Sequence, residues 1–95
     1  MELFTPLTKF YEAIEDDVRI SPSHISIYMA LLQQWNITGG VNPISISRDP
    51  IMKNSKISAR STYNNCLHDL QEYGYIKYQP STCGYRRSKI YLKGI

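Results

Sequence analysis

The sequence predicts a small α+β domain, mainly helical, with a β-hairpin near its C-terminus. Three segments repeat apolar residues at helical spacing, and two later segments alternate apolar and polar residues as strands do. At 95 residues, with 42% hydrophobic and 20% charged residues, the chain has the size and composition of one folded domain. Large multidomain enzyme folds and intrinsic disorder are therefore excluded.

The first predicted helix is amphipathic and lies within residues 1–20. Thr5 followed by Pro6 is typical of an N-cap and a first helical position, and the helix is expected to end between Asp16 and Arg19. Its apolar stripe comprises Leu3, Phe4, Leu7, Phe10, Tyr11, Ile14 and Val18. Such a helix either completes the core of its own domain or pairs with the same helix of a second chain. We favour the second arrangement, a homodimer.

The second predicted helix is the central one. Ser21 and Pro22 repeat the start signal, and Gly39 and Gly40 end the helix because glycine adopts the left-handed C-cap conformation without strain. Apolar residues occupy most of its circumference, which is typical of a helix contacted on several sides. We expect residues 21–95 to form one domain around it.

A short strand at residues 43–47 and a short helix are predicted next. The strand alternates apolar and small polar residues. Ser47 or Asp49 is suited to cap the helix, and Pro50 fits only in its first turn. Residues 56–58 then form a tight turn.

A longer helix is predicted for residues 59–73, with Ser58 as its N-cap and Gly74 at its C-terminal end. Its core-facing residues are Ala59, Tyr63, Cys66, Leu67 and Leu70. These positions leave a polar face on the other side of the helix.

Two alternating segments, residues 75–79 and 88–92, predict the strands of the hairpin. The intervening residues 80–87 have the composition of a loop. Arg86 and Arg87 fall at its tip, where paired arginines suit a phosphate backbone or a minor groove.

Charge is distributed unevenly along the chain. Residues 1–43 carry two basic and five acidic side chains, a net charge of −3, whereas residues 44–95 carry nine basic and three acidic ones, a net charge of +6. A basic C-terminal half favours a polyanionic partner, although solvated surface lysines and arginines would give the same count. No apolar run approaches the ~20 residues that span a bilayer, and no signal-peptide pattern is present, so we expect a cytoplasmic location without a membrane partner.

The short helix, turn and longer helix follow the order of a helix-turn-helix, whose second helix enters the major groove of double-stranded DNA. The polar side chains that we expect to contact DNA from this helix are Ser58, Arg60, Ser61, Thr62, Asn64, Asn65 and His68. Arg60 is suited to guanine, and Asn64 or Asn65 to adenine. The lysines expected to add positive charge are Lys53, Lys56, Lys77 and Lys89. A merely solvated helix face is the alternative interpretation.

The stretch SARSTYNNCLHDLQEYGYI, residues 58–76, resembles the recognition helix of bacterial winged helix-turn-helix regulators. The matching positions are Thr62, Tyr63, Leu67, Leu70, Gly74, Tyr75 and Ile76. The following strand–loop–strand is similar to the wing, so the resemblance covers roughly residues 22–92. It implies a winged helix-turn-helix with an extra N-terminal helix, which binds double-stranded DNA, commonly as a dimer, without catalysis. Small stand-alone proteins of bacterial mobile elements are also similar.

The sequence departs from this family pattern in two places. The arginine in the middle of such helices is replaced by asparagine, at position 64 or 65, and Pro50 shortens the preceding helix. The first difference bears directly on base preference and affinity.

Transcriptional regulation is the function that we expect. A DNA-binding accessory factor for recombination or replication of a mobile element, and a protein-interaction module with an exposed apolar patch, are the alternatives. No carboxylate pair, nucleophile–base motif or phosphate-binding loop is visible, and Cys66, Cys83, His24 and His68 lack zinc-ligand spacing. We therefore expect no enzyme activity, cofactor, metal or small-molecule substrate.

Overall fold

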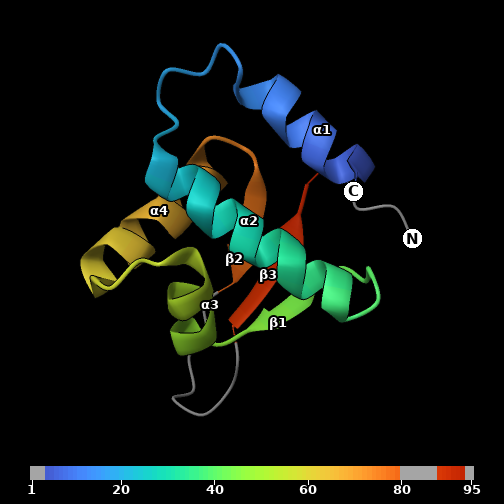
Figure 1. The fold of residues 1–95 in the computed structure, drawn as a ribbon, viewed down its shortest axis with the longest axis vertical. Coiled ribbons are helices and arrows are strands. Elements are labelled where there is room, and N and C mark those ends of the chain that lie inside the picture. Colours follow the sequence, from blue (N-terminus) through green and yellow to red (C-terminus); the bar gives the residue numbers. More distant parts are fainter. Residues whose placement is uncertain (1–3, 80–87, 94–95) are drawn as a thin grey trace.

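Four helices and a three-stranded antiparallel sheet make up the described part of the chain (Figure 1). The computed structural model describes residues 4–79 and 88–93, and for residues 4–6 the backbone alone. The elements in chain order are α1 (Phe4–Ile14), α2 (Pro22–Ile37), β1 (Ile44–Ile46), α3 (Arg48–Ser55), α4 (Arg60–Glu72), β2 (Ile76–Gln79) and β3 (Ser88–Leu92). The predicted α+β class, mainly helical with a small sheet, is confirmed.

Helix α2 is central, as predicted, and packs against α3, α4 and β1 (Figure 1). Ser21 caps it: the Ser21 hydroxyl accepts from the backbone N–H of His24, and His24 Nδ1 accepts from the backbone N–H of Ser21 at 2.9 Å. Residues on several sides of the helix are buried, namely His24, Ile27, Tyr28, Ala30, Leu31, Leu32 and Trp35. Gly39 and Gly40 follow its end with positive φ angles, which is the conformation that their sequence position predicts.

Helix α1 packs on α2 through an aromatic stack. The rings of Phe10 and Tyr28 are parallel to within 2° with their centroids 3.8 Å apart, and Phe10 is only 3% exposed. Leu7 and Ile14 are half-buried against the same core, which confirms the inner part of the predicted stripe. Tyr11, predicted to widen that stripe, is 47% exposed. Leu3 and the side chain of Phe4 lie outside the described residues.

The chain leaves α1 at Ile14, earlier than predicted, because residues 17–19 form a hydrogen-bonded turn. The Arg19 guanidinium donates to both carboxylate oxygens of Asp17, at 2.8 and 2.9 Å, and lies 4.0 Å from the centroid of the Tyr73 ring. The Tyr75 hydroxyl donates to the same carboxylate at 2.6 Å. This turn directs Val18 into solvent, where it is 97% exposed, so its predicted place in the apolar stripe is wrong.

Helix α4 begins one residue later than predicted. Its N-cap is Ala59, and no side chain caps it, so the prediction of Ser58 as the N-cap is wrong. Ala59 is exposed rather than part of the core, because it precedes the first helical residue. The other predicted core residues, Tyr63, Cys66, Leu67 and Leu70, are buried. Gly74, with φ of 89°, ends the helix as predicted.

The sheet has three strands in the order β1-β3-β2, one more than the predicted hairpin contains. β3 is the central strand and pairs antiparallel with both neighbours, with Ile44 opposite Ile90 and Ile76 opposite Leu92. These four side chains are all buried and face the helices. The side-chain amide of Asn42 adds two hydrogen bonds to the backbone of Leu92, at 3.0 and 3.1 Å, and so extends the contact between the two chain segments two residues beyond the Ile44–Ile90 pair.

Replacing Phe10 with Ala is expected to lower the free energy of unfolding by about 3–5 kcal/mol, because the change removes a buried ring from the α1–α2 contact. Urea unfolding followed by far-UV circular dichroism measures it. Tyr11→Ala is the matched control on the same helix, and its half-exposed ring predicts a much smaller loss. Equal losses for the two variants would contradict this packing of α1.

Stability should depend on Asp17 in acid. The hydrogen bonds from Arg19 and then Tyr75 hold the pKa of Asp17 well below its usual range, whereas the unfolded value is about 3.9. A depressed folded pKa stabilises the fold above the unfolded pKa, and this contribution is lost as the pH falls toward the folded value. Asp17→Asn should therefore be less stable than wild type at neutral pH, and the gap should narrow progressively as the pH falls from about 4 toward the lowered folded pKa.

The exposed Asp16 offers the control. Urea unfolding of Asp16→Asn is expected to follow the wild-type pH dependence. A constant stability difference between Asp17→Asn and wild type at all pH values would contradict the role given to this carboxylate.

Candidate nucleic-acid interface

The outer face of α4 carries most of the residues expected to contact DNA. Because a helix turns about 100° per residue, the buried side chains of α4 all lie on one side, and the polar residues lie on the other. Those that are exposed are Arg60, Ser61, Asn64, Asn65 and His68, whereas Thr62 is half-buried. The helix therefore brings Ser61, Asn64, Asn65 and His68 onto its outer surface. Arg60 is exposed as the first helical residue, but it lies seven residues before the buried Leu67 and so on the flank of this surface.

One flank of this face is fixed to β2. The side-chain oxygen of Gln71 accepts a hydrogen bond from the backbone N–H of Tyr78 at 2.7 Å, and the His68 ring meets the Tyr78 ring edge-on at a centroid distance of 5.9 Å. By contrast, Asn64 and Asn65 make no hydrogen bond with any residue that the structure describes. The amide groups in the middle of α4 are thus available to a partner, whereas Gln71 is engaged in the fold.

The other flank of α4 is fixed to the start of α2 by a buried histidine. His24 is 6% exposed, and its Nε2 lies 2.9 Å from the Asp69 carboxylate on α4. Since a backbone N–H only donates, the bond from Ser21 assigns His24 Nδ1 as an acceptor and places the ring proton on Nε2, which donates to Asp69. One side chain therefore caps α2 and orients α4.

Sequence reasoning missed this role of His24 and of Gln71. The spacing Ser21-x-x-His24 is that of a capping box, but the usual third residue there is Glu or Gln. The contact with Asp69 joins residues 45 positions apart, and no local pattern predicts it.

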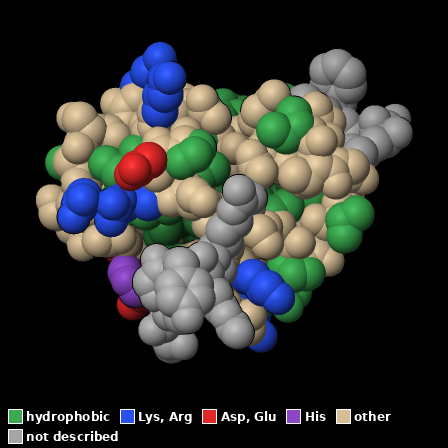
Figure 2. Space-filling view, turned by 90° about the horizontal axis from the view of Figure 1, so that it is seen from below, with side chains coloured by type: hydrophobic (Ala, Val, Ile, Leu, Met, Phe, Trp, Pro, Cys, Tyr) green, Lys and Arg blue, Asp and Glu red, His purple; other side chains and the backbone are tan. Residues whose placement is uncertain are grey.

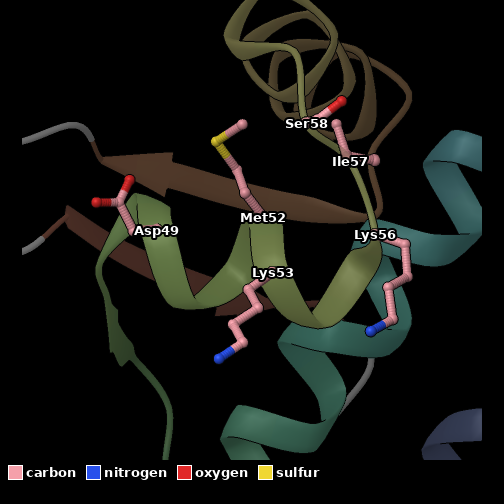
Figure 3. A pocket seen from close by; sticks show the side chains of 6 residues that line it. All are labelled: Asp49, Met52, Lys53, Lys56, Ile57 and Ser58. Atoms are coloured by element: carbon pink, nitrogen blue, oxygen red, sulfur yellow. The ribbon is translucent and has the colours of Figure 1, made fainter.

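Two lysines, Lys53 on α3 and Lys56 at its C-cap, lie next to the turn that leads into α4. Lys56 has a left-handed backbone with φ of 63°, and the Ser26 hydroxyl on α2 donates to the carbonyl of Ser55. A hollow of about 380 Å³ opens here, lined by Asp49, Met52, Lys53, Lys56, Ile57 and Ser58. In Figure 3 the ammonium groups of Lys53 and Lys56 extend on the same side of α3, and Met52 extends toward Ser58. Ile57 is half-buried against the core.

Two further lysines predicted to add positive charge, Lys77 and Lys89, lie on β2 and β3. Lys77 and Lys89 are exposed, and the pairing of Ile46 with Ser88 places the start of β3 next to the chain that enters α3. Arg86 and Arg87 lie outside the described residues. Figure 2 shows this end of the molecule, where Lys and Arg side chains lie on both sides of the grey segment with acidic and apolar side chains between them. On this face, the described Lys and Arg side chains are dispersed rather than gathered in one patch.

The described residues also bear on metal binding, on membrane insertion and on the state of Cys66. Within residues 4–79 and 88–93, no three His, Cys, Asp or Glu side chains form a group able to hold a metal ion. No helix in this part of the chain has the length and apolar character to cross a membrane. The thiol of Cys66 packs in the core, where burial raises its pKa.

Comparisons of the chain with protein-family models, curated proteins and solved structures gave no match. The arrangement of its own residues is therefore what bears on its function.

Lys56 is expected to be replaceable by glycine with a gain in stability. A side chain at positive φ costs about 1 kcal/mol, which glycine avoids, so Lys56→Gly should raise the free energy of unfolding by up to that amount. Urea unfolding measures it. Lys56→Ala removes the same charge but keeps the strained backbone, and it should show no such gain. Stabilisation by alanine equal to that by glycine would contradict the backbone explanation.

Proposed function

We propose that the protein is a winged helix-turn-helix protein that binds specific sequences of double-stranded DNA and regulates transcription, with α4 in the major groove. The observation that carries the proposal is the division of α4 into two sides. Its apolar side and both flanks are engaged in the fold, whereas Arg60, Ser61, Asn64 and Asn65 are exposed in the first half of the helix. An α-helix fits the major groove and reads base edges with such side chains.

The order of the elements supports the winged-helix part of the proposal. Helix α2, strand β1, helices α3 and α4, and strands β2 and β3 follow one another in the order that the family resemblance implies. The segment between β2 and β3 would form the wing, with Arg86 and Arg87 on the flanking backbone. Because these two residues lie outside the described part of the chain, their role rests on the sequence.

Exposed lysines would supply contacts to DNA phosphates, which do not depend on the base sequence. Lys53 and Lys56 are exposed and line the hollow next to Ser58, two residues before α4 begins, and Lys89 is exposed on β3. Ammonium groups at these positions would bind phosphates, release counterions and fix the orientation of α4 on the duplex. Asp49, the acidic residue of α3, has its carboxylate 3.2 Å from Arg48 Nε, which offsets its charge.

We also propose that the protein binds DNA as a homodimer. The apolar stripe of α1 lies on its own domain through Phe10, so a second copy would use another surface. Ile37, the last residue of α2, and Val41, which follows Gly40, are exposed apolar residues of the kind that such a contact buries. A selected DNA site with two-fold symmetry would support the homodimer, and an unsymmetrical site would contradict it.

Selection from a random duplex library, followed by fluorescence anisotropy on the selected site, tests the proposed function. Arg60→Ala should weaken binding to that site by about 1–3 kcal/mol and relax one base position. Lys53→Gln should weaken binding to all sequences alike and reduce the salt dependence by about one counterion.

Lys9→Gln serves as the control for both variants, because Lys9 is an exposed cation on α1. Its binding should equal that of wild type. If selection enriches no sequence, or if Arg60→Ala binds the selected site as wild type does, this placement of α4 is wrong.

A further inference from the structure

We infer, on the basis of the proposed function, that α4 meets DNA through its N-terminal half and that Asn65, rather than Asn64, reads an adenine there. The two asparagines are adjacent and chemically identical, so sequence alone treats them alike. Their positions around α4 and the charges along it distinguish them.

Asn65 belongs to the outermost row of α4. With about 100° per residue, Ser61, Asn65, His68 and Glu72 all lie within about 30° of the direction opposite the buried side chains. Asn64 lies about 70° from that direction, on the flank that carries Gln71, which is hydrogen-bonded to β2. A helix that approaches a groove with its outermost row therefore presents Asn65 to the bases and Asn64 toward the sheet.

The charges along α4 select its N-terminal half. Arg60 is the first helical residue, and the backbone N–H groups of a helix N-terminus favour phosphate. Glu72 is exposed at the other end, and the last turn holds no basic residue. Phosphates are therefore attracted to the start of the helix and repelled at its end, so the N-terminal half of α4 lies closest to the duplex. Of the outermost row, only Ser61 and Asn65 belong to that half, and these two side chains are nearest the bases.

The hydrogen-bonding groups of Ser61 and Asn65 then indicate which base is recognised. An asparagine amide pairs with N6 and N7 of adenine through one donor and one acceptor, whereas a serine hydroxyl contacts any base. Asn65 makes no hydrogen bond with a described residue, so its amide is available for this pair. The selected site should contain an adenine opposite Asn65 in each bound subunit.

A cycle of protein and DNA changes tests the inference. On the selected duplex, each adenine is replaced in turn by 7-deazaadenine, which lacks the N7 acceptor but keeps Watson–Crick pairing and the minor groove. One such replacement should weaken wild-type binding about 5- to 100-fold. Asn65→Ala should weaken binding to the natural site to a similar degree, and the two changes together should do no more than either alone.

Asn64→Ala is the matched control and should keep the full sensitivity to 7-deazaadenine. The inference is overturned if Asn64→Ala abolishes that sensitivity, if no adenine is coupled to Asn65, or if the selected site lacks adenine. Each of these results requires a protein that binds a selected site, so each leaves the proposed function intact. Failure to bind any duplex would instead overturn the proposed function together with the inference.

Discussion

The burial of α2 on several sides is the constraint on which the rest of the structure depends. Each neighbouring helix is attached to it by a specific contact: α1 by the stack of Phe10 on Tyr28, α3 by the hydroxyl of Ser26, and α4 by His24. The sheet packs against the same helix through β1. A helix in this position fixes the angle between α3 and α4, and that angle determines which side chains of α4 face outward.

One side of helix α4 packs in the core, and its opposite side is exposed. Tyr63, Leu67 and Leu70 fill the core, while Asp69 and Gln71 tie its flanks to α2 and β2. Both flank contacts lie in its second half, so the first half is held mainly by its buried side. A helix anchored at its C-terminal half and open at its N-terminal half has the arrangement that the proposed groove reading would require, because its position in the fold is fixed without a partner.

The helices could be predicted because their signals are local. Ser21 with Pro22 and the glycine at position 74 mark helix ends directly, and the exposed face of α4 follows from its apolar spacing. Strand β1 was predicted as an element, but its pairing with β3 was not. That pairing joins residues more than 40 positions apart, and no local pattern indicates it. The histidine–aspartate contact was missed for the same reason. Val18 was misplaced because the turn between Asp17 and Arg19 competes with one more turn of helix.

The most direct test of this account is an NMR titration of the ¹⁵N-labelled full chain with duplex DNA carrying a selected site. If α4 lies in the major groove, amide shifts change along α4 from Arg60 to His68 and at Lys53 and Lys56, while α1 remains unaffected. Changes confined to α1, or to the exposed apolar residues Ile37 and Val41, would contradict this placement of α4, because the DNA would then lie on a surface that α4 does not form.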